Sequence, residues 1–282
     1  MNIQWFPGHM AKTRRLLNEN LKLIDVVIEL LDARIPKSSK NPEIESIINK
    51  KPRVTVLNKA DMADEKISLE WQRWFEQNGI KCVFIDSIKG TGINALKIML
   101  REAAKHKIQK EKQRGKIFIP IRTMVVGIPN VGKSSFINKV AGRASAATGD
   151  RPGVTRGKQW IRLNNEIELL DTPGILWPKF EDEETGLHLA WTGAIKDDIL
   201  DKIELSSLLM QKLLLLYPDE LKARYKIDSS ATFSTGYDIL LAAGKNRGCI
   251  VSGGEVDLNR ISSIVLDEFR GAKIGRITLE RP

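Results

Sequence analysis

The segment 127–134, with the sequence GIPNVGKS, constrains this chain more than any other stretch of it. It matches G-x-x-x-x-G-K-[ST] and follows the apolar run at residues 123–126. In this pattern the glycines let the backbone curl, so that N–H groups face phosphate oxygens at the start of a helix. The segment therefore predicts a strand, a tight loop and a helix that begins near Lys133, which is typical of a parallel α/β sheet.

The polar side chains of this loop have distinct expected roles. We expect Lys133 to reach the β- and γ-phosphates of a nucleotide, where it acts in catalysis, and the Ser134 hydroxyl to bind Mg²⁺. Ser135 is a second candidate for the metal, but the spacing selects Ser134. The residues expected to line the phosphates here are Asn130, Val131, Gly132, Lys133, Ser134 and Ser135.

Two later segments add candidates for the metal and the γ-phosphate. Residues 171–174 read DTPG after an apolar strand, where Asp171 is expected to hold Mg²⁺ through water and the Gly174 N–H to sense the γ-phosphate. The alternative is a plain turn, which Pro and Gly both favour. Thr155, in the RPGVT stretch 151–155, is the candidate switch threonine for Mg²⁺ and catalysis, and the alternative is an ordinary flexible loop.

An early NKAD segment at residues 58–61 indicates which base is bound. The Asp61 carboxylate can accept hydrogen bonds from guanine N1–H and the N2 amino group, a donor pair that adenine lacks. We expect Asn58 to brace the loop and the aliphatic stem of Lys59 to cover the base. Ser87 and Ile88 follow the next strand, where a backbone N–H can meet guanine O6, although Ile88 departs from the usual Ala of such loops.

The order of these segments is unusual. NKAD precedes the phosphate loop by about seventy residues, whereas in ordinary GTPases the phosphate loop comes first. The order therefore predicts a circularly permuted GTPase of doubly wound α/β fold. Strands are expected at 26–32, 54–57, 82–86, 123–126 and 168–171, with helices near 11–20 and 69–77.

Beyond Pro178 the pattern changes to helical spacing. Apolar residues recur as Leu205, Leu208, Leu209, Leu213 and Leu216, and again as Leu258, Ile261, Val265 and Phe269. We therefore predict two domains: a GTPase domain at 1–178 with a basic segment 1–20, and an RNA-binding, all-helical domain at 179–282.

Charge separates the two parts of the chain. Residues 1–179 hold 32 Lys and Arg against 18 Asp and Glu, and residues 180–282 hold 13 against 17. A basic body favours a nucleic-acid partner, although modest basicity also serves solubility. The charged connector at 103–116 is either a solvated helix end and linker or a contact to an RNA backbone.

Composition excludes several classes of protein. Two distant cysteines, Cys82 and Cys249, indicate buried thiols in a reducing compartment and no disulfide. No apolar run is long enough to span a membrane, and the first ten residues show no targeting pattern. A cytoplasmic monomer with no membrane contact and no DNA partner is the expectation.

The position after DTPG lacks the usual catalytic glutamine. Ile175 stands there and can neither orient nor polarise water, so slow intrinsic hydrolysis is expected. His9, in the FPGHM stretch, is the candidate that positions the attacking water once a partner orders the N-terminus. The alternative for His9 is an RNA or structural contact.

The other two histidines have different expected places. His106 is expected to be exposed and His188 to pack in a helix. Asn130 is a candidate K⁺ ligand, or makes a plain loop hydrogen bond.

Together these motifs resemble the ribosome-biogenesis GTPase A family. The resemblance rests on WFPGHM at 5–10, DARIP at 32–36, the early NKAD, GIPNVGKSS, RPGVT and DTPG, in this order. It implies a circularly permuted GTPase that uses GTP, GDP and Mg²⁺, acts in late maturation of the large ribosomal subunit, binds ribosomal RNA and is stimulated by the particle. It also implies a helical C-terminal domain similar to RNA-binding antitermination modules. Two alternatives stay open: a switch acting on protein partners without RNA, and a nucleotide-binding module without useful catalysis.

Overall fold

The computed structural model describes residues 10–48, 51–142, 160–162, 166–170 and 182–282. The chain divides into two compact units. The described residues up to Leu170, together with Glu280–Pro282, form an α/β unit, and residues 182–279 form a helical unit. The two units are described separately below.

The α/β unit contains a six-stranded sheet in the order β3-β2-β1-β4-β6-β5. Neighbouring strands are parallel except β5, which runs antiparallel to β6 at the sheet edge. The strands are β1 (Val26–Asp32), β2 (Arg53–Asn58), β3 (Cys82–Ile85), β4 (Ile121–Val126), β5 (Trp160–Arg162) and β6 (Ile167–Leu170). Because parallel strands end at one edge, the loops after β1, β2, β3 and β4 meet there.

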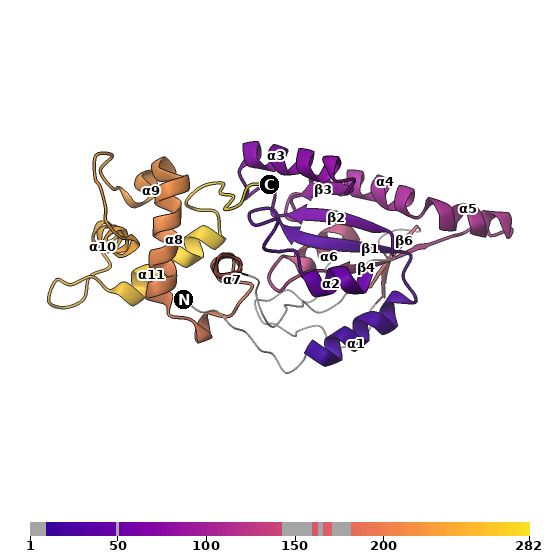
Figure 1. The fold of residues 1–282 in the computed structure, drawn as a ribbon, viewed down its shortest axis with the longest axis horizontal. Helices are drawn as coiled ribbons and strands as arrows, with labels where there is room; N and C mark the ends of the chain where they lie inside the picture. The colour runs from indigo at the N-terminus through magenta and orange to yellow at the C-terminus, as the bar shows by residue number, and fades with distance from the viewer. Residues whose placement is uncertain (1–9, 49–50, 143–159, 163–165, 171–181) are drawn as a thin grey trace. The chain divides into compact units, whose positions relative to one another are not determined.

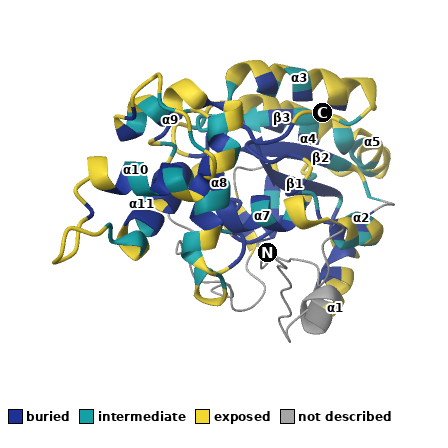
Figure 2. Ribbon diagram, turned by 60° about the vertical axis from the view of Figure 1, so that its left-hand side comes forward, coloured by how far each residue is buried: buried dark blue, intermediate teal, exposed yellow. Residues whose placement is uncertain are grey.

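Helices cover both faces of this sheet, with α2 in front of the strands and α6 behind them (Figure 1). The helices are α1 (Met10–Leu21), α2 (Pro42–Ile48), α3 (Glu65–Gln77), α4 (Ile93–Ala103), α5 (Lys105–Gln113) and α6 (Lys133–Ala141). On one face, Leu17, Ile44 and Ile48 pack against Val27 and Met124 of the sheet. Strand β1 is buried along its whole length, as Figure 2 shows, and β2 and β4 each have one residue that is not buried, Arg53 and Arg122. These strands therefore read as nearly continuous apolar runs rather than alternating ones.

The sequence-based elements of this unit are confirmed to within a few residues, except at two helices. Helix α3 starts four residues before the expected Leu69, because the Asp64 carboxylate accepts hydrogen bonds from the N–H groups of Lys66 and Ile67 and caps it. The connector at 103–116 is not mainly a linker: most of it forms the separate helix α5, which has no buried residue.

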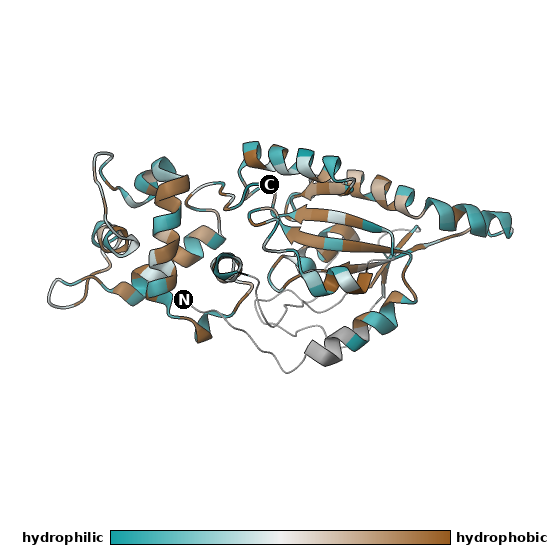
Figure 3. Ribbon diagram, viewed as in Figure 1, coloured by the Kyte–Doolittle hydropathy of each residue, from teal (hydrophilic) through white to brown (hydrophobic). Residues whose placement is uncertain are grey.

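The helical unit has five α-helices and one 3-10 turn among its described residues. They are α7 (Glu183–Trp191), η1 (Asp197–Ile199), α8 (Lys202–Leu216), α9 (Pro218–Tyr225), α10 (Gly236–Asn246) and α11 (Leu258–Arg270). Leu205, Leu209 and Leu213 of α8 are buried as their spacing predicts, and so is Met210. Leu208 is half-buried, and Leu216, the last residue of the helix, is exposed. The apolar stripes of this unit are visible in Figure 3.

One arginine closes the end of α7. The Arg270 guanidinium donates to the carbonyl oxygens of Ala190 and Trp191 and forms an ion pair with Asp197 at 2.7 Å. Helix C-termini leave carbonyl groups unpaired, so this side chain satisfies two of them. Elsewhere in the unit, the Tyr217 hydroxyl exchanges hydrogen bonds with the backbone of Thr278. These contacts hold the segment after α11 against α8 and α9.

The C-terminus departs from the predicted domain boundary. We expected the helical domain to continue to residue 282, but Glu280–Pro282 group with the α/β unit. The other predicted boundary, at 178/179, lies outside the described residues. Cys82 and Cys249 are free thiols; Cys249 is buried as expected, whereas Cys82 is half-buried. Among the described residues, none of the helices is long and apolar enough to span a membrane.

Candidate functional site

The NKAD loop and the phosphate loop are tied together at the carboxyl edge of the sheet. The Asn58 side-chain amide donates to the carbonyl oxygen of Val131 at 2.9 Å, and the Lys59 ammonium donates to that of Asn130 at 2.8 Å. Asn58 therefore braces the phosphate loop, as predicted. Lys59 was predicted to cover the base with its aliphatic stem, whereas the contacts seen here are made by its ammonium group. Segments about seventy residues apart thus form one continuous surface.

The backbone of the phosphate loop leaves no room for side chains at its glycines. A Cβ on Gly132, whose φ is +94°, would lie 2.5 Å from Asn58 Nδ2, and a Cβ on Gly127 would lie 2.5 Å from the carbonyl oxygen of Leu30. Asn130 also has a positive φ of 55°. The Lys133 ammonium donates to the carbonyl oxygens of Gly127 and Ile128 at 3.1 and 2.6 Å. The loop is therefore curled over the start of α6, the geometry that cradles phosphates.

A buried charge network lies beneath this junction. The Arg34 guanidinium makes a two-pronged contact with Asp32, at 2.9 and 2.8 Å, and both side chains are at most 2 % exposed. The Lys59 ammonium lies 3.0 Å from the same carboxylate. Burial by itself raises the pKa of Asp32, but Arg34 and Lys59 outweigh it and hold that pKa far below its ordinary value. Sequence reasoning placed Asp32 and Arg34 only within a motif and missed this role.

The loop after β3 contributes in a different way from the one expected. The Ser87 hydroxyl donates to Asn58 Oδ1 at 2.6 Å, so it orients the amide that holds the phosphate loop. The N–H groups of Ile88 and Lys89 both donate to the Asp86 carboxylate, at 2.7 and 2.9 Å. Asp86 therefore shapes the turn whose N–H was predicted to meet guanine O6. The signal that could have identified this role of Asp86 is an Asp at the start of a turn, because its carboxylate can accept the N–H groups two and three residues later.

The remaining residues can be placed only in part. Asp61 is half-buried, and no described group donates a hydrogen bond to its carboxylate, so it can accept from a base. Ser134 is half-buried and Ser135 exposed in the first turn of α6. His188 is buried and His106 exposed, as expected. His9, Thr155, Asp171, Gly174 and Ile175 lie outside the described residues.

The donor set fits a guanine nucleotide. Gly127 and Gly132 provide a cradle that any Cβ would fill, and Lys133 adds positive charge at its base. Asp61 and the Asn58–Ser87 pair stand on the neighbouring loops, where the strand order places a purine. The described residues hold no group of three or more His, Cys, Asp or Glu that could bind a metal on its own. For a magnesium ion, the described part of the predicted set is thus the Ser134 hydroxyl.

Comparisons with known proteins show the family of this chain. Residues 122–219 match the family described as "50S ribosome-binding GTPase". The "Ribosome biogenesis GTPase A" of Bacillus cereus is 49% identical over 282 residues, which cover 100% of this chain and 95% of that protein. The protein of the same name in Thermotoga maritima is 30% identical over 280 residues, covering 99% of this chain and 95% of the relative.

Two solved structures share the fold over nearly the whole chain. The GDP-bound structure of TM YlqF gives a TM-score of 0.68 at 25% identity and covers 95% of this chain and 99% of its own. The GNP-bound YlqF from T. maritima gives 0.66 at 26% identity, with 96% and 98% covered. The permuted order of the motifs, the cradle at the sheet edge and these likenesses lead to one conclusion. The chain belongs to the ribosome biogenesis GTPase A family, whose members are guanine-nucleotide-binding GTPases of ribosome assembly.

Proposed function

We propose that the GTP-bound protein docks on a precursor of the large (50S) ribosomal subunit late in its maturation, and that hydrolysis drives release. Nucleotide binding is supported above all by the contacts through which Asn58 and Lys59 of the NKAD loop hold the phosphate loop. The ribosomal part is supported by relatives named for ribosome biogenesis and by a matching family described as binding the 50S ribosome. Such a cycle would take place in the cytoplasm, with the protein acting as a monomer.

The chemistry we propose uses Mg²⁺, which neutralises charge on the β- and γ-phosphates when bound. Ser134 would hold it, together with Thr155 and Asp171. Lys133 would exchange its carbonyl partners for phosphate oxygens, and the Gly174 N–H would meet the γ-phosphate. Asn130 would bind K⁺ beside the phosphates. Because Ile175 cannot orient water, we assign that role to His9 and expect the particle to stimulate turnover.

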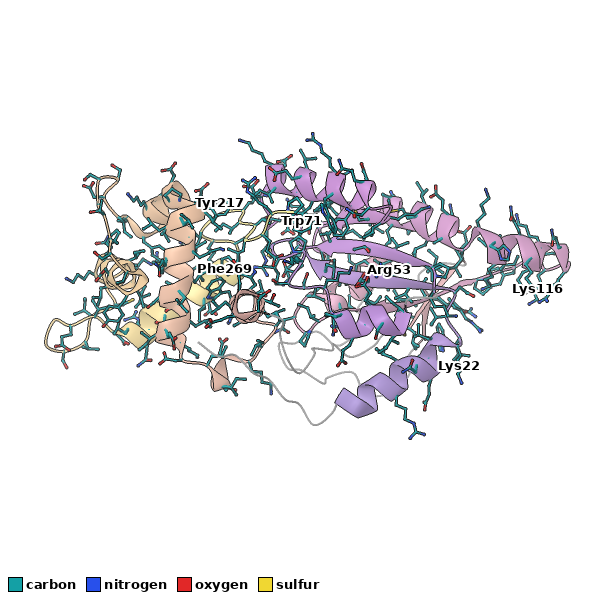
Figure 4. The ribbon with its side chains drawn as sticks, in the orientation of Figure 1. Lys22, Arg53, Trp71, Lys116, Tyr217 and Phe269 are labelled. Carbon is teal, nitrogen blue, oxygen red and sulfur yellow. The ribbon has the colours of Figure 1, made fainter. Side chains whose placement is uncertain are left out.

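For the ribosomal RNA contact we propose helix α5. It buries no residue, and Lys105, Lys110 and Lys112 are exposed without forming a salt bridge to another described residue. Ile117 and Phe118 follow it and are 101% and 57% exposed, next to Lys116, which is labelled in Figure 4. A helix that is polar all round gains little stability from packing, so a binding partner for its exposed charges would explain why α5 is present. Exposed ammonium groups on a helix that is followed by an exposed aromatic residue suit a phosphate backbone and an unstacked base.

A switch that acts on proteins without RNA is the competing function. Salt dependence separates the two, because the slope of log K against log salt becomes shallower by roughly 0.7 to 0.9 for each phosphate that the protein no longer neutralises. Lys105→Glu, Lys110→Glu and Lys112→Glu combined should weaken binding to precursor large subunits and flatten that slope by about two to three units. The matched control carries Lys22→Glu, Lys66→Glu and Arg73→Glu, three cations that are also exposed but lie elsewhere in the α/β unit. Equal effects of both triple variants would remove α5 from the interface.

The decisive experiment is GTP turnover with and without precursor large subunits, in potassium and in sodium. We expect a large rise with the particle that is greater in potassium and lost in His9→Ala. Lys66→Ala is the control, because this side chain is exposed on α3 and belongs neither to α5 nor to the nucleotide site. If no particle raises the turnover, the switch that acts on protein partners is favoured. If the particle stimulates His9→Ala as strongly as wild type, the ribosomal function stands but His9 does not orient the water.

A further inference from the structure

Residues 33–41, here named the support loop, connect β1 to α2 beneath the nucleotide site. Only Lys37 and Lys40 in this loop are not buried. A buried loop must find partners for its backbone N–H groups, because each unpaired one costs free energy comparable to a lost hydrogen bond. Some of its hydrogen bonds are internal, such as Ile35 N–H to Asp32 and Ser39 N–H to Ile35. The others reach far along the sequence.

The Glu280 carboxylate supplies the long-range partners. Its oxygens accept the N–H of Lys37 at 2.7 Å, the N–H of Ser38 at 3.0 Å and the Ser38 hydroxyl. Glu280 is 8% exposed and stands 242 positions after Ser38 in the chain. Three donors thus converge on one carboxylate, which only an acceptor with two oxygens and no protons can satisfy.

Glu280 is itself held in place by helix α3. The Trp71 indole N–H donates to the Glu280 carbonyl oxygen at 3.1 Å, and the Arg281 guanidinium contacts both carboxylate oxygens of Glu70 at 2.9 Å. Trp71 is 3% exposed, and both views of the fold place the C-terminus beside α3 (Figures 1, 2 and 4). The carboxylate is therefore a fixed part of the α/β unit rather than a loose chain end.

The support loop leads directly to the residues that hold the nucleotide loops. The Ser39 hydroxyl accepts the Asp32 N–H at 3.1 Å, and the Ala33 N–H donates to the Asn58 carbonyl oxygen at 2.9 Å. Asp32 in turn fixes the Lys59 ammonium. One or two hydrogen bonds thus connect the support loop to Asn58 and, through Asp32, to Lys59.

We propose that Glu280 is a positioning residue of the guanine-nucleotide site, which acts through the support loop on Asp32 and Lys59. The proposal rests on guanine-nucleotide binding and not on the ribosomal particle, so its failure is distinguishable from failure of the ribosomal function. Glu280→Gln keeps the size of the side chain but replaces one acceptor oxygen with an NH₂ group, which cannot accept from the donors that face that oxygen. Loss of that acceptor leaves a buried N–H without a partner, and the loop must shift to relieve it.

The test measures the Kd of GDP for full-length wild type, Glu280→Gln and Glu280→Ala, after circular dichroism has shown that each variant is folded. Affinity should fall roughly 3- to 30-fold, the range of couplings carried by such networks. Glu102→Gln is the matched control: it makes the same change at a carboxylate whose ion pair with Lys81 is well exposed, so GDP affinity should stay at the wild-type value. An unchanged Kd in folded Glu280→Gln would overturn the proposal.

A double-mutant cycle separates positioning from general stabilisation. If Glu280 acts through Lys59, then Glu280→Gln should change the Kd of GDP by less than about twofold in a Lys59→Ala background. A merely structural role predicts the same loss in both backgrounds, and that additivity would reject the proposed route. Because Glu280→Gln is isosteric, it provides a folded variant for the test even if Glu280→Ala fails to fold.

Discussion

The Lys59 ammonium lies 3.0 Å from the Asp32 carboxylate, and the same ammonium donates to the carbonyl oxygen of Asn130. One side chain thus connects the ends of β1 and β2 with the loop after β4. The position of Lys59 in its loop requires a positive φ of 58°, which is uncommon for a residue with a side chain. These contacts explain why this backbone conformation is kept: the base-reading loop and the phosphate loop are held by the same cation.

Replacing Asp32 should destabilise the fold and weaken nucleotide binding together. Asp32→Asn leaves the buried Arg34 guanidinium without its counter-ion, and the expected loss is about 3 kcal/mol of unfolding free energy. Urea unfolding measures this loss. Glu102→Gln is the control, because its ion pair with Lys81 is well exposed and should contribute little.

The same variant should show a defined pH dependence. Since the folded-state pKa of Asp32 is far below the unfolded one, its stabilising contribution is complete above about pH 5 and declines as the pH falls below the unfolded pKa of about 4. The stability gap between wild type and Asp32→Asn should therefore be constant from about pH 6 to 8 and narrow at about pH 3. A gap that grows on acidification would contradict the assignment.

Asp61→Asn should change the base preference. We expect the Asp61 carboxylate to accept hydrogen bonds from two donors of guanine, whereas an amide would present one donor and one acceptor. We expect affinity for GDP to fall by about 10²-fold, the size of one or two charge-assisted hydrogen bonds, and affinity for xanthosine diphosphate to rise. Titration with both nucleotides measures this preference. A variant that still prefers GDP as strongly as wild type would disprove the role of Asp61.

Gly132→Ala should abolish nucleotide binding without unfolding the protein. Its new Cβ would lie 2.5 Å from Asn58 Nδ2, so the phosphate loop and the Asn58 amide must separate. Gly142→Ala is the matched control: its φ of +68° is similarly positive, but no atom lies within 4 Å of the added Cβ. The control should lose about 1 kcal/mol of stability and bind GDP normally. Similar binding defects in both variants would mean that backbone strain, and not the contact with Asn58, is responsible.

Glu29→Gln should stabilise the protein at neutral pH. Glu29 lies in the middle of β1, where burial raises its pKa although Arg53, labelled in Figure 4, opposes the rise. A carboxyl group with a raised folded-state pKa contributes stability below its unfolded pKa and loses it as the pH rises through the folded one. The melting temperature of Glu29→Gln should thus exceed that of wild type at about pH 7.5, and the difference should shrink towards about pH 4.5. Thermal melts across this range test it, and a lower melting temperature at neutral pH would show that the pair with Arg53 dominates.

The sequence alone was sufficient for the parts of the structure that depend on neighbouring residues. Apolar runs of four to seven residues located five of the six strands, since a strand buried on both faces needs no alternation, but the three-residue edge strand β5 was not predicted. Gly127, Gly132 and Lys133 predicted a strand–loop–helix unit, because only that local backbone curls around phosphates. The order of NKAD and GIPNVGKS in the sequence predicted the circular permutation. The six-stranded sheet, in the order β3-β2-β1-β4-β6-β5, agrees with that prediction.

The long-range pairings were decided by the tertiary structure. Asp32 is 27 positions from Lys59, Asn58 is 73 from Val131, and Ser38 is 242 from Glu280. Nothing in their local spacing joins these residues, because a side chain finds a distant partner only after the sheet has set which strand ends are neighbours. Helix α5 illustrates the reverse case: its charges were recognised, but a helix with no buried face leaves no apolar period in the sequence. Patterns of adjacent residues therefore specified the elements and the chemistry of the loops, and packing decided which charges hold those loops together.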